Sequence, residues 1–521
     1  MGTGPNRRRV LMGAGAFAAI AALAENAILL SEAIAGGTAE PSPPPGETFA
    51  ADHVKKLAEE LAKSEFVKPR METPEPFNAL SAEQYRDIRF RPEAAIWRGQ
   101  NLGYEVQLLP MGWLYDAPVE IWIVEGGQAR SLRADTASFS IGRSIEKAPE
   151  AAPFGFSGFR VASTLNRADA LDDVVQFQGA SYFKSVGRNQ QYGLAARGLA
   201  INTARPGGEE FPLFRAFWIE KPDPAAPEIV VQALLDSVSV TGAYRFTIRP
   251  GRETEMTVVA ELFPRRELTH VGLGPLTSMY FYGPGQRRFV GDFRPAVHNS
   301  EGLAVVNGHG ERLWRPLTNP KTLQTSAFVD KNLLGFGLLQ RDRSFGAFED
   351  LEARFDRRPS AWIEPIGNWG DGYVELIEIP VAEEIHDNIV AYWKPAKPLE
   401  QGKRFRYAYR MTWGEDIPVV WSGAWVAKTQ IGAGNNPDTV QFVVDFAGPA
   451  ARDARELPVA DLMASAGATS NLTVQQHPTL PGIRVKFALN TAGTELIELR
   501  LGLKLAGQLI SENWLYRWTR A

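Results

Sequence analysis

Short runs of alternating hydrophobic and polar residues make up most of the chain beyond residue 100. They are rich in β-branched and aromatic residues and end at Gly, Pro or Asp, which is typical of strands. No long helical periodicity interrupts them, so the pattern predicts an all-β fold with a large antiparallel β-sandwich. The predicted strands include Tyr104–Leu109, Val119–Val124, Ile229–Leu235, Arg245–Ile248, Met256–Leu262 and Val374–Ile379.

Two short helices are predicted ahead of these strands. Val54, Leu57, Ala58 and Leu61 recur at helical spacing and indicate an amphipathic helix. The sequence Ser81-Ala82-Glu83-Gln84 is a capping-box pattern that predicts the start of a second helix.

A domain boundary is predicted at Lys394-Pro395-Ala396-Lys397-Pro398. New strands begin at Arg404–Thr412 and continue to the end of the chain. A stretch of short strands of this length suits an immunoglobulin-like sandwich of about 100 residues. We therefore expect a large sandwich over residues 51–396 and an immunoglobulin-like domain over 404–521.

The N-terminus has the features of an export signal. Arg7-Arg8-Arg9-Val10-Leu11 precedes a Gly/Ala-rich, weakly hydrophobic stretch, which resembles a twin-arginine signal. Ala33-Ile34-Ala35 fits a cleavage site, so residues 1–35 are predicted to be removed and the protein to reside in the periplasm. The alternative is a lone membrane anchor, which the polar residues Glu25 and Asn26 disfavour. The Pro-rich residues 36–50 are predicted to form a flexible leader.

Composition narrows the function. The 521 residues carry a formal net charge of -4 with no basic stripe beyond the leader, which argues against a nucleic-acid partner. There is no cysteine, and the six histidines show no metal-binding spacing, so no metal is expected. Nucleotide-binding motifs are missing from the sequence, and no cofactor is expected. The oligomeric state stays open.

Aromatic and acidic residues supply the candidate chemistry. The chain has 13 Trp and 13 Tyr, and aromatic planes can cover the apolar faces of sugar rings. Trp314 and Trp369 lie in Gly/Pro-punctuated segments and are candidate sugar platforms, although core positions are the simpler interpretation. Two acidic clusters could serve glycosidic-bond chemistry or could be solvated surface charge: Glu375, Glu378, Glu383, Glu384 and Asp387, and Asp342, Glu349, Asp350, Glu352 and Asp356.

Long segments of the chain resemble the osmoregulated periplasmic glucan biosynthesis proteins of the MdoG/OpgG and OpgD type. The resemblance runs from about residue 48 to the last strand, and the leader favours the D-type subgroup. The segments that carry it include Leu80–Pro92, Tyr192–Ala200, Gly208–Pro212, Gly335–Arg341, Arg358–Trp362 and Asp387–Trp393.

The resemblance implies a galactose-mutarotase-like supersandwich, an immunoglobulin-like domain and a cleft for linear β-1,2-glucan. D-type members are similar to endo-acting, anomer-inverting β-1,2-glucanases with one aspartate as general acid. By motif that residue is Asp387, with Glu384 supporting it or sharing in a proton relay. Tyr192 and Arg197 lie in one of the shared segments and are expected to contact the substrate.

Two positions depart from the family pattern. Asn299 stands where we expect an aspartate at the base end of the relay, and an amide cannot accept a proton at neutral pH. Phe355 stands where we expect a tyrosine. Asp292 or Glu301 could replace the missing base, or a sugar hydroxyl could replace water as the acceptor.

Three functions remain open at this point. The first is an endo-β-1,2-glucanase-like enzyme that uses Asp387 as its acid. The second is a transglycosylase that shapes or cyclises glucan chains. The third is a non-catalytic, glucan-binding scaffold that works with the membrane glucan synthase machinery.

Overall fold

The computed structural model describes residues 46–73, 75–133, 136–145, 154–286, 291–415 and 421–520. The predicted signal, residues 1–35, and most of the predicted leader lie outside the described residues. The end of the leader is not a free segment, because β1 (Glu47–Thr48) pairs with β5 (Gln128–Ser131).

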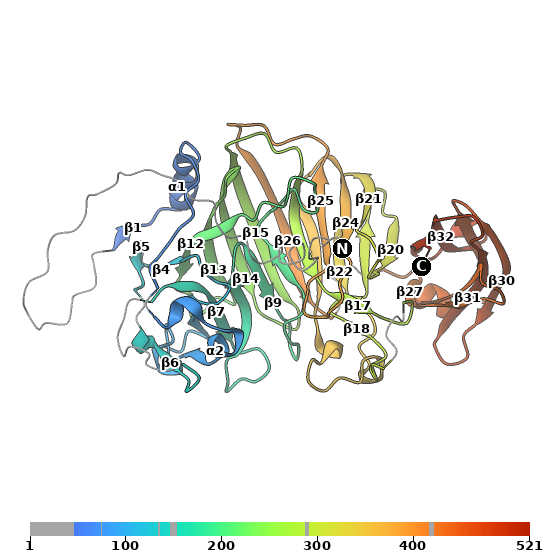
Figure 1. Cartoon of the computed structure of the whole chain (residues 1–521), viewed down its shortest axis with the longest axis horizontal. Coiled ribbons are helices and arrows are strands. Elements are labelled where there is room, and N and C mark those ends of the chain that lie inside the picture. The colour runs from blue at the N-terminus through green and yellow to red at the C-terminus, as the bar shows by residue number, and fades with distance from the viewer. Residues whose placement is uncertain are drawn as a thin grey trace, which may run out of the picture.

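Two large β-sheets pack face to face and form the large body of the protein (Figure 1). Every second side chain of each sheet points into the shared core, as the alternating sequence pattern requires. In spatial order, the ten-stranded sheet consists of β21 (Gln324–Lys331), β24 (Asp371–Glu378), β25 (Ile389–Pro395), β16 (Val271–Ser278), β10 (Ala195–Arg197), β9 (Tyr182–Ser185), β8 (Asp172–Gln178), β7 (Phe156–Ser163) and β3 (Tyr104–Pro110), with β11 (Ala200–Ile201) on β16.

The second sheet has 16 strands and continues beyond the large body. It is antiparallel except where β4 meets β12 and where β20 meets β34. Its order is β1, β5, β4 (Glu120–Glu125), β12 (Leu213–Glu220), β13 (Ile229–Asp236), β14 (Val240–Arg249), β15 (Thr254–Pro264), β26 (Phe405–Gly414), β23 (Ser360–Ile366), β22 (Gly335–Leu339), β19 (Gly302–Val306), β20 (Arg312–Pro316), β34 (Asn513–Thr519), β32 (Leu496–Leu505) and β29 (Val459–Ala464), with β33 (Gln508–Leu509) on β32.

The predicted domain boundary is wrong by one strand. β26 (Phe405–Gly414) lies between β15 and β23 and pairs with both along its length. Without β26, the large sheet would have a gap between β15 and β23, so the large body extends to Gly414. The prolines around residue 396 mark a turn within this body and do not separate two domains.

The remaining strands form a C-terminal sandwich, drawn in red at one end of Figure 1. One of its sheets contains β27 (Trp425–Ala433), β28 (Thr439–Ala447), β31 (Gly482–Asn490) and β30 (Ala468–Gln476), in that order. The other contains β34, β32 and β29. The seven strands of the sandwich, leaving out the short β33, can be numbered one to seven in chain order. The first sheet then has the order 1-2-5-4 and the second has the order 7-6-3. This is the order of the constant-type immunoglobulin sandwich, so the expected topology is confirmed.

The two parts of the molecule share a hydrophobic core. Trp314 and Trp362 come from the large sheet, yet they pack among the inner residues of the C-terminal sandwich. Leu303 and Val305 of β19 point into the large core, whereas the intervening Ala304 points into the C-terminal core. One strand therefore supplies side chains to both cores.

The described helices are short. α1 (His53–Leu61) buries Val54 and Ala58 against the outer face of the large sheet, and α2 (Ala82–Arg86) begins with the predicted capping box at Ser81. The third is α3 (Pro449–Arg452). Within the described residues, no helix is long and apolar enough to cross a membrane.

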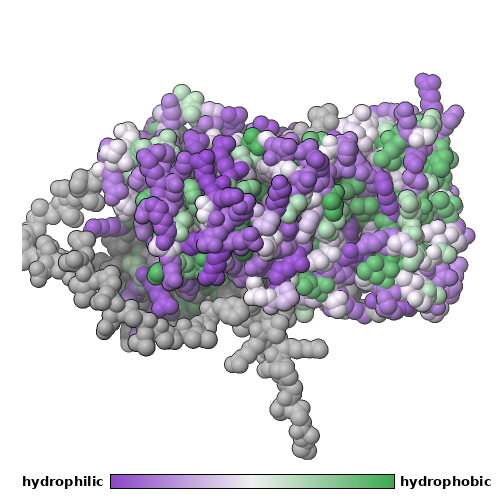
Figure 2. All heavy atoms as spheres, turned by 90° about the horizontal axis from the view of Figure 1, so that it is seen from above, coloured by the Kyte–Doolittle hydropathy of each residue, from purple (hydrophilic) through white to green (hydrophobic). Residues whose placement is uncertain are grey.

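Exposed apolar residues are scattered over the C-terminal sandwich. Val459 and Met463 of β29 are 70% and 59% exposed. In the view of Figure 2, hydrophobic patches lie toward the end of the molecule that this sandwich occupies, mixed with polar residues. Such scattering is ordinary and does not by itself define a binding surface.

We predict that Trp314→Ala destabilises the whole protein. The ring is 1% exposed in the shared core, and removing a buried Trp costs about 3–5 kcal/mol. Chemical denaturation monitored by circular dichroism would measure the loss. The control, Val459→Ala, should change stability by less than about 0.5 kcal/mol. A Trp314→Ala protein as stable as the wild type would contradict the assignment of this ring to the core.

Candidate functional site

The face of the ten-stranded sheet that points away from the core carries polar and aromatic side chains. On β9, Phe183 points into the core, while Tyr182 and Lys184 point outward. On β10, Ala196 points inward and Arg197 outward, directly opposite Tyr182. We call this surface the open face. It also includes Arg160, Gln176, Gln178, Thr277, Glu375 and Tyr392.

Arg197 is held rigidly at the centre of the open face. Its Nε donates to Thr277 Oγ1 at 2.9 Å, and its guanidinium group forms an ion pair with Glu209. The guanidinium carbon also lies 4.9 Å from the centre of the Tyr182 ring. The side chain is only 5% exposed, so Arg197 presents a fixed positive charge.

Lys184 is a second positive charge on the same face, and it has no hydrogen-bonding partner among the described residues. Its Nζ lies 4.8 Å from the centre of the Tyr192 ring. Burial lowers the pKa of this ammonium group, and the nearby Arg160 lowers it further. The Tyr192 hydroxyl is buried and, within the described part of the chain, also lacks a partner. A ligand hydroxyl could satisfy the Lys184 ammonium group.

Asp387 lies in the loop between β24 and β25, and its neighbour Asn388 fixes that loop. Asn388 Oδ1 accepts the Tyr280 N–H at 2.8 Å, and its Nδ2 donates to the carbonyl oxygens of Tyr280 and Ile379 at 3.0 and 3.1 Å. The Asn388 side chain is fully buried. The loop therefore holds Asp387 in one place although Asp387 itself is exposed.

The electrostatic surroundings of Asp387 suit a proton donor. The loss of solvation among surrounding protein atoms raises the pKa of its carboxyl group, whereas Arg197, Lys184 and His386 oppose that rise. Arg197 and Lys184 thus act on Asp387 from the open face. In the described residues the carboxyl group forms no hydrogen bond or ion pair, so its proton is available to a ligand.

Glu384, which is expected to support Asp387 or to share in a proton relay, is paired with an arginine and is not among the groups that act on the Asp387 pKa. Its Oε2 accepts from Arg294 Nη2 at 2.7 Å, and the same guanidinium group binds Asp292 and Asp350. Glu384 is therefore one of three carboxylates paired with the same arginine. The rise in the Asp387 pKa comes from desolvation instead.

Sequence reasoning missed an aromatic cluster at one end of the open face. The rings of Tyr85, Trp113 and Tyr115 lie 5.4–6.3 Å apart, and Trp113 is 42% exposed. Gln178 Nε2 donates to the Tyr85 hydroxyl at 2.7 Å and connects the cluster to the sheet. Trp113 has a left-handed backbone (φ 55°), a strain that is common at ligand sites. The Gly112-Trp113-Leu114-Tyr115 turn was the available signal.

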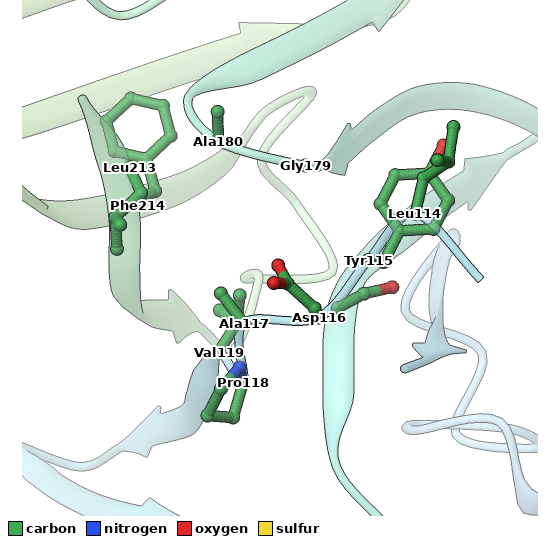
Figure 3. A pocket seen from close by; sticks show the side chains of 11 residues that line it. Leu114, Tyr115, Asp116, Ala117, Pro118, Val119, Gly179, Ala180, Leu213 and Phe214 are labelled. Atoms are coloured by element: carbon green, nitrogen blue, oxygen red, sulfur yellow. The ribbon is translucent and has the colours of Figure 1, made fainter. Parts of the chain in front are cut away.

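Figure 3 shows a small pocket beside this cluster, with Tyr115 on one side and Leu213 and Phe214 on the other. Its volume is only about 50 Å³, which is too small for a sugar. A carbohydrate would have to lie over the exposed Trp113 ring.

A polar network lies toward the other end of the open face. Glu375 accepts from Tyr392 Oη at 2.7 Å, and His270 Nε2 lies 2.9 Å from the same carboxyl group. Arg205 pairs with the other oxygen of Glu375. Gly272 makes room for this network, because a Cβ there would stand 2.4 Å from the Tyr392 ring. Polar groups thus continue along the sheet on both sides of Arg197.

Comparison with known proteins decides the family. A family model described as "Periplasmic glucan biosynthesis protein, MdoG" matches residues 49–518. This chain belongs to the MdoG family. The family expected from the sequence is thereby confirmed, and its description places it in periplasmic glucan biosynthesis.

Relatives in the MdoG family span nearly the whole chain. Glucans biosynthesis protein G of Shewanella frigidimarina is 47% identical over 474 residues, which cover 90% of this chain and 85% of that protein. The protein of the same name from Vibrio cholerae is 46% identical over 476 residues, covering 91% and 87%. Both carry the G-type name, which does not support the expected D type.

Solved structures give only distant likenesses. A GH36 α-galactosidase from Geobacillus stearothermophilus has a TM-score of 0.25 at 9% identity and covers 50% of this chain and 39% of its own. A galactose mutarotase related enzyme from Lactobacillus acidophilus has a TM-score of 0.21 at 8% identity and covers 47% and 99%. Scores this low carry no argument about the site of this MdoG protein.

Asn299 lies close to the loop that carries Asp387. Its backbone N–H donates to the Met279 carbonyl at 2.8 Å, between the two residues, Ser278 and Tyr280, that bind Asn388. Within the described part of the chain its amide side chain forms no hydrogen bond. The position where an MdoG aspartate is expected is therefore near the acid, but it holds a group that cannot accept a proton.

The two predicted substitutes for that aspartate differ as bases. Both oxygens of Asp292 accept from Arg294, and this pairing holds the pKa of Asp292 far below its usual range. Burial raises the pKa of Glu301, whose carboxyl group accepts backbone N–H groups of Arg341 and Asp342 at 3.2 and 3.3 Å. Glu301 is therefore the stronger base of the two.

Phe355 is a core residue in this structure. It is 4% exposed, packs with Phe348 and Val297, and lies under the Arg358 guanidinium group at 5.6 Å. The hydroxyl expected from the family pattern is replaced by an apolar contact.

The two tryptophans predicted as sugar platforms do not join the open face. Trp314 lies on β20 in the shared core, where Arg341 covers its ring at 3.6 Å. Trp369 packs on Tyr407 and Tyr409 and donates from Nε1 to the Ala408 carbonyl at 3.1 Å. It precedes β24 whereas Asp387 follows that strand, so roughly 25 Å separates them at about 3.3 Å per residue.

We predict that Lys184→Met raises the pKa of Asp387 further. The ammonium group favours the charged carboxylate, so its removal favours the protonated acid. Carboxyl titration by NMR on isotope-labelled protein would measure the shift. Lys394→Met is the control, because Lys394 lies on the open side of β25 but is not among the charges that act on Asp387. An unchanged or lowered pKa in Lys184→Met would disprove the electrostatic coupling.

Proposed function

We propose that this protein binds linear β-1,2-glucan along the open face and cleaves or transfers glycosyl units with Asp387 as general acid. One observation carries the proposal: Asp387, in an exposed loop, has a carboxyl group whose pKa is raised by desolvation and which has no hydrogen-bonding partner among the described residues. The family supplies the glucan context, and periplasmic location with twin-arginine export is part of the same proposal.

The open face suits a linear, neutral sugar polymer. The exposed ring of Trp113 can cover a sugar ring, and Arg197 and Lys184 can donate hydrogen bonds to hydroxyl groups. These groups extend across several neighbouring strands, and adjacent strands are about 4.8 Å apart. An extended polymer can therefore contact the sheet over several sugar units.

In the proposed reaction, Asp387 donates its proton to the glycosidic oxygen as the bond to the anomeric carbon breaks. A hydroxyl group then forms the new bond to that carbon and loses its own proton to a base. The leaving chain keeps the proton from Asp387 as its new hydroxyl group. The base then releases the acceptor's proton to solvent and Asp387 takes one proton from solvent, so both groups return to their starting states and no net proton is consumed.

Transglycosylation is the second candidate, and Asn299 favours it. Water needs a base to remove its proton, and the position nearest the acid loop holds an amide. A second sugar bound on the open face could supply the accepting hydroxyl group by proximity, which favours it over water as the acceptor. Transglycosylation predicts that the length of the glucan chains changes while few new reducing ends form.

We predict that Asp387→Asn abolishes turnover while binding and stability stay close to wild type. The amide has nearly the same shape but has no acidic proton, and acid catalysis is worth about 10²–10⁴-fold. Turnover of linear β-1,2-glucan, calorimetric binding and thermal melting should be measured on the same preparation. Asp371→Asn, at the other end of β24, is the matched control and should remain active. Turnover in Asp387→Asn within a few-fold of wild type would remove this residue from the mechanism.

We also predict that Asn299→Asp shifts the reaction toward hydrolysis. A carboxylate at this position can accept a proton from water, and a positioned base contributes about 10²–10⁴-fold, so hydrolysis should rise at least about tenfold. The ratio of new reducing ends to size-changed products would report it. Asn471→Asp on the exposed strand β30 should leave the ratio unchanged. An equal ratio in Asn299→Asp and wild type would show that Asn299 does not face the acceptor.

A further inference from the structure

A cavity of about 570 Å³ lies between the large body and the C-terminal sandwich. This volume is within the range of roughly 300–1,000 Å³ that is usual for small-molecule sites. None of its lining residues belongs to the open face. We call it the distal cavity. It is lined by Arg341 and Asp342 of the large body and by Trp425, Ala427, Lys428, Gln430, Asp445, His477, Leu480 and Arg484 of the C-terminal sandwich.

Strand register builds one wall of the distal cavity. Lys428 of β27 lies opposite Asp445 of β28, which lies opposite Arg484 of β31. Their neighbours Phe446 and Val485 point into the sandwich core, so this row points outward. Arg484 binds both oxygens of Asp445 at 2.7 and 2.8 Å, which fixes the middle of the row.

An aromatic plane stands at one end of this wall. Trp425 is 38% exposed, although it lies in the first position of a strand. Its ring is supported by Gly448, where a Cβ would stand 2.5 Å from the ring atom Cζ3. The close support on one side and the exposure on the other make the ring a platform rather than a core residue.

The charges of the distal cavity nearly cancel. Arg341 forms a bidentate pair with Glu512, and Arg484 is matched by Asp445. This leaves one positive group, Lys428, and one negative group, Asp342. In the described residues, the side chains of Lys428 and Gln430 have no hydrogen-bonding partner. An aromatic platform with free donors and little net charge fits a neutral polyol better than an anion.

We propose that the distal cavity binds a second segment of neutral glucan, outside the open face. The proposal rests on the proposed function for the identity of the sugar. A long glucan held at both the open face and the distal cavity gains affinity because its second contact is intramolecular. A short oligosaccharide that occupies only the open face gains nothing from Trp425.

The test compares Trp425→Ala with wild type on long and short substrates. Binding of long linear β-1,2-glucan is measured by calorimetry in the Asp387→Asn background, where the ligand is not consumed. We expect Trp425→Ala to weaken it about tenfold, which is the loss of a modest second contact. In the otherwise wild-type protein, kcat/KM for a short β-1,2-linked oligosaccharide should stay unchanged. Met463→Ala, on the other sheet of the same sandwich, is the control for the loss of an exposed apolar side chain.

Any other outcome overturns the distal site, the proposed chemistry or both. Unchanged long-glucan affinity in Trp425→Ala overturns the distal site, and so does an equal loss for long and short ligands, since that would reflect the fold or the open face. Full turnover in Asp387→Asn would refute the proposed chemistry, and the distal site would then be tested by comparing kcat/KM of Trp425→Ala and wild type on long and short glucan. If neither wild type nor Asp387→Asn binds this glucan, both proposals fall together. Lys428→Met should also weaken binding of the long glucan, because it removes a free hydrogen-bond donor from the cavity, and unchanged affinity in Lys428→Met would exclude a contact of the sugar with this donor.

Discussion

The packing of two large β-sheets determines which side chains of this protein are free to meet a ligand. Because side chains alternate along each strand, burying Phe183 and Ala196 in the core forces Tyr182, Lys184 and Arg197 onto the opposite face. A shift of register by one residue would bury two positive charges and expose the apolar set. The hydrophobic core therefore specifies the chemical surface as strictly as it specifies the fold.

Two arginines act on nearby carboxyl groups in different ways. Arg294 contacts its carboxylates directly and lowers the pKa of Asp292, and the Ala353 N–H together with Arg294 lowers the pKa of Asp350, so these groups are bound as anions. Arg197 has its own partner in Glu209 and acts on Asp387 only through space. Desolvation then outweighs the positive charges, and Asp387 keeps a raised pKa. The difference between a structural carboxylate and a candidate acid lies in whether an arginine reaches it.

The sequence predicted the positions of strands better than it predicted which residues contact one another in the fold. Period-two patterns located β3, β13, β15 and β24, because burial of one face of a strand produces a local alternation of hydrophobic and polar residues. The pattern around Trp314 and Trp369 does not show whether these side chains are buried, since a Trp beside Gly or Pro can stand over a ligand or fill a core. The pairing of Glu384 with Arg294 joins residues 90 positions apart, and spacing cannot reveal it. β26 was assigned to the wrong part because a Pro-rich turn within a sheet has the same composition as a linker.

The parallel pairing of β20 with the last strand, β34, has a consequence for synthesis on the ribosome. Until residue 513 has emerged, β20 is an open sheet edge, and Trp314 and Trp362 lack the C-terminal residues that cover them. The large body cannot be completed from the N-terminus alone, although domains commonly fold in that order. The final strand acts as a closing element, so a chain interrupted late would display an unpaired edge and two tryptophans to quality-control proteases and chaperones.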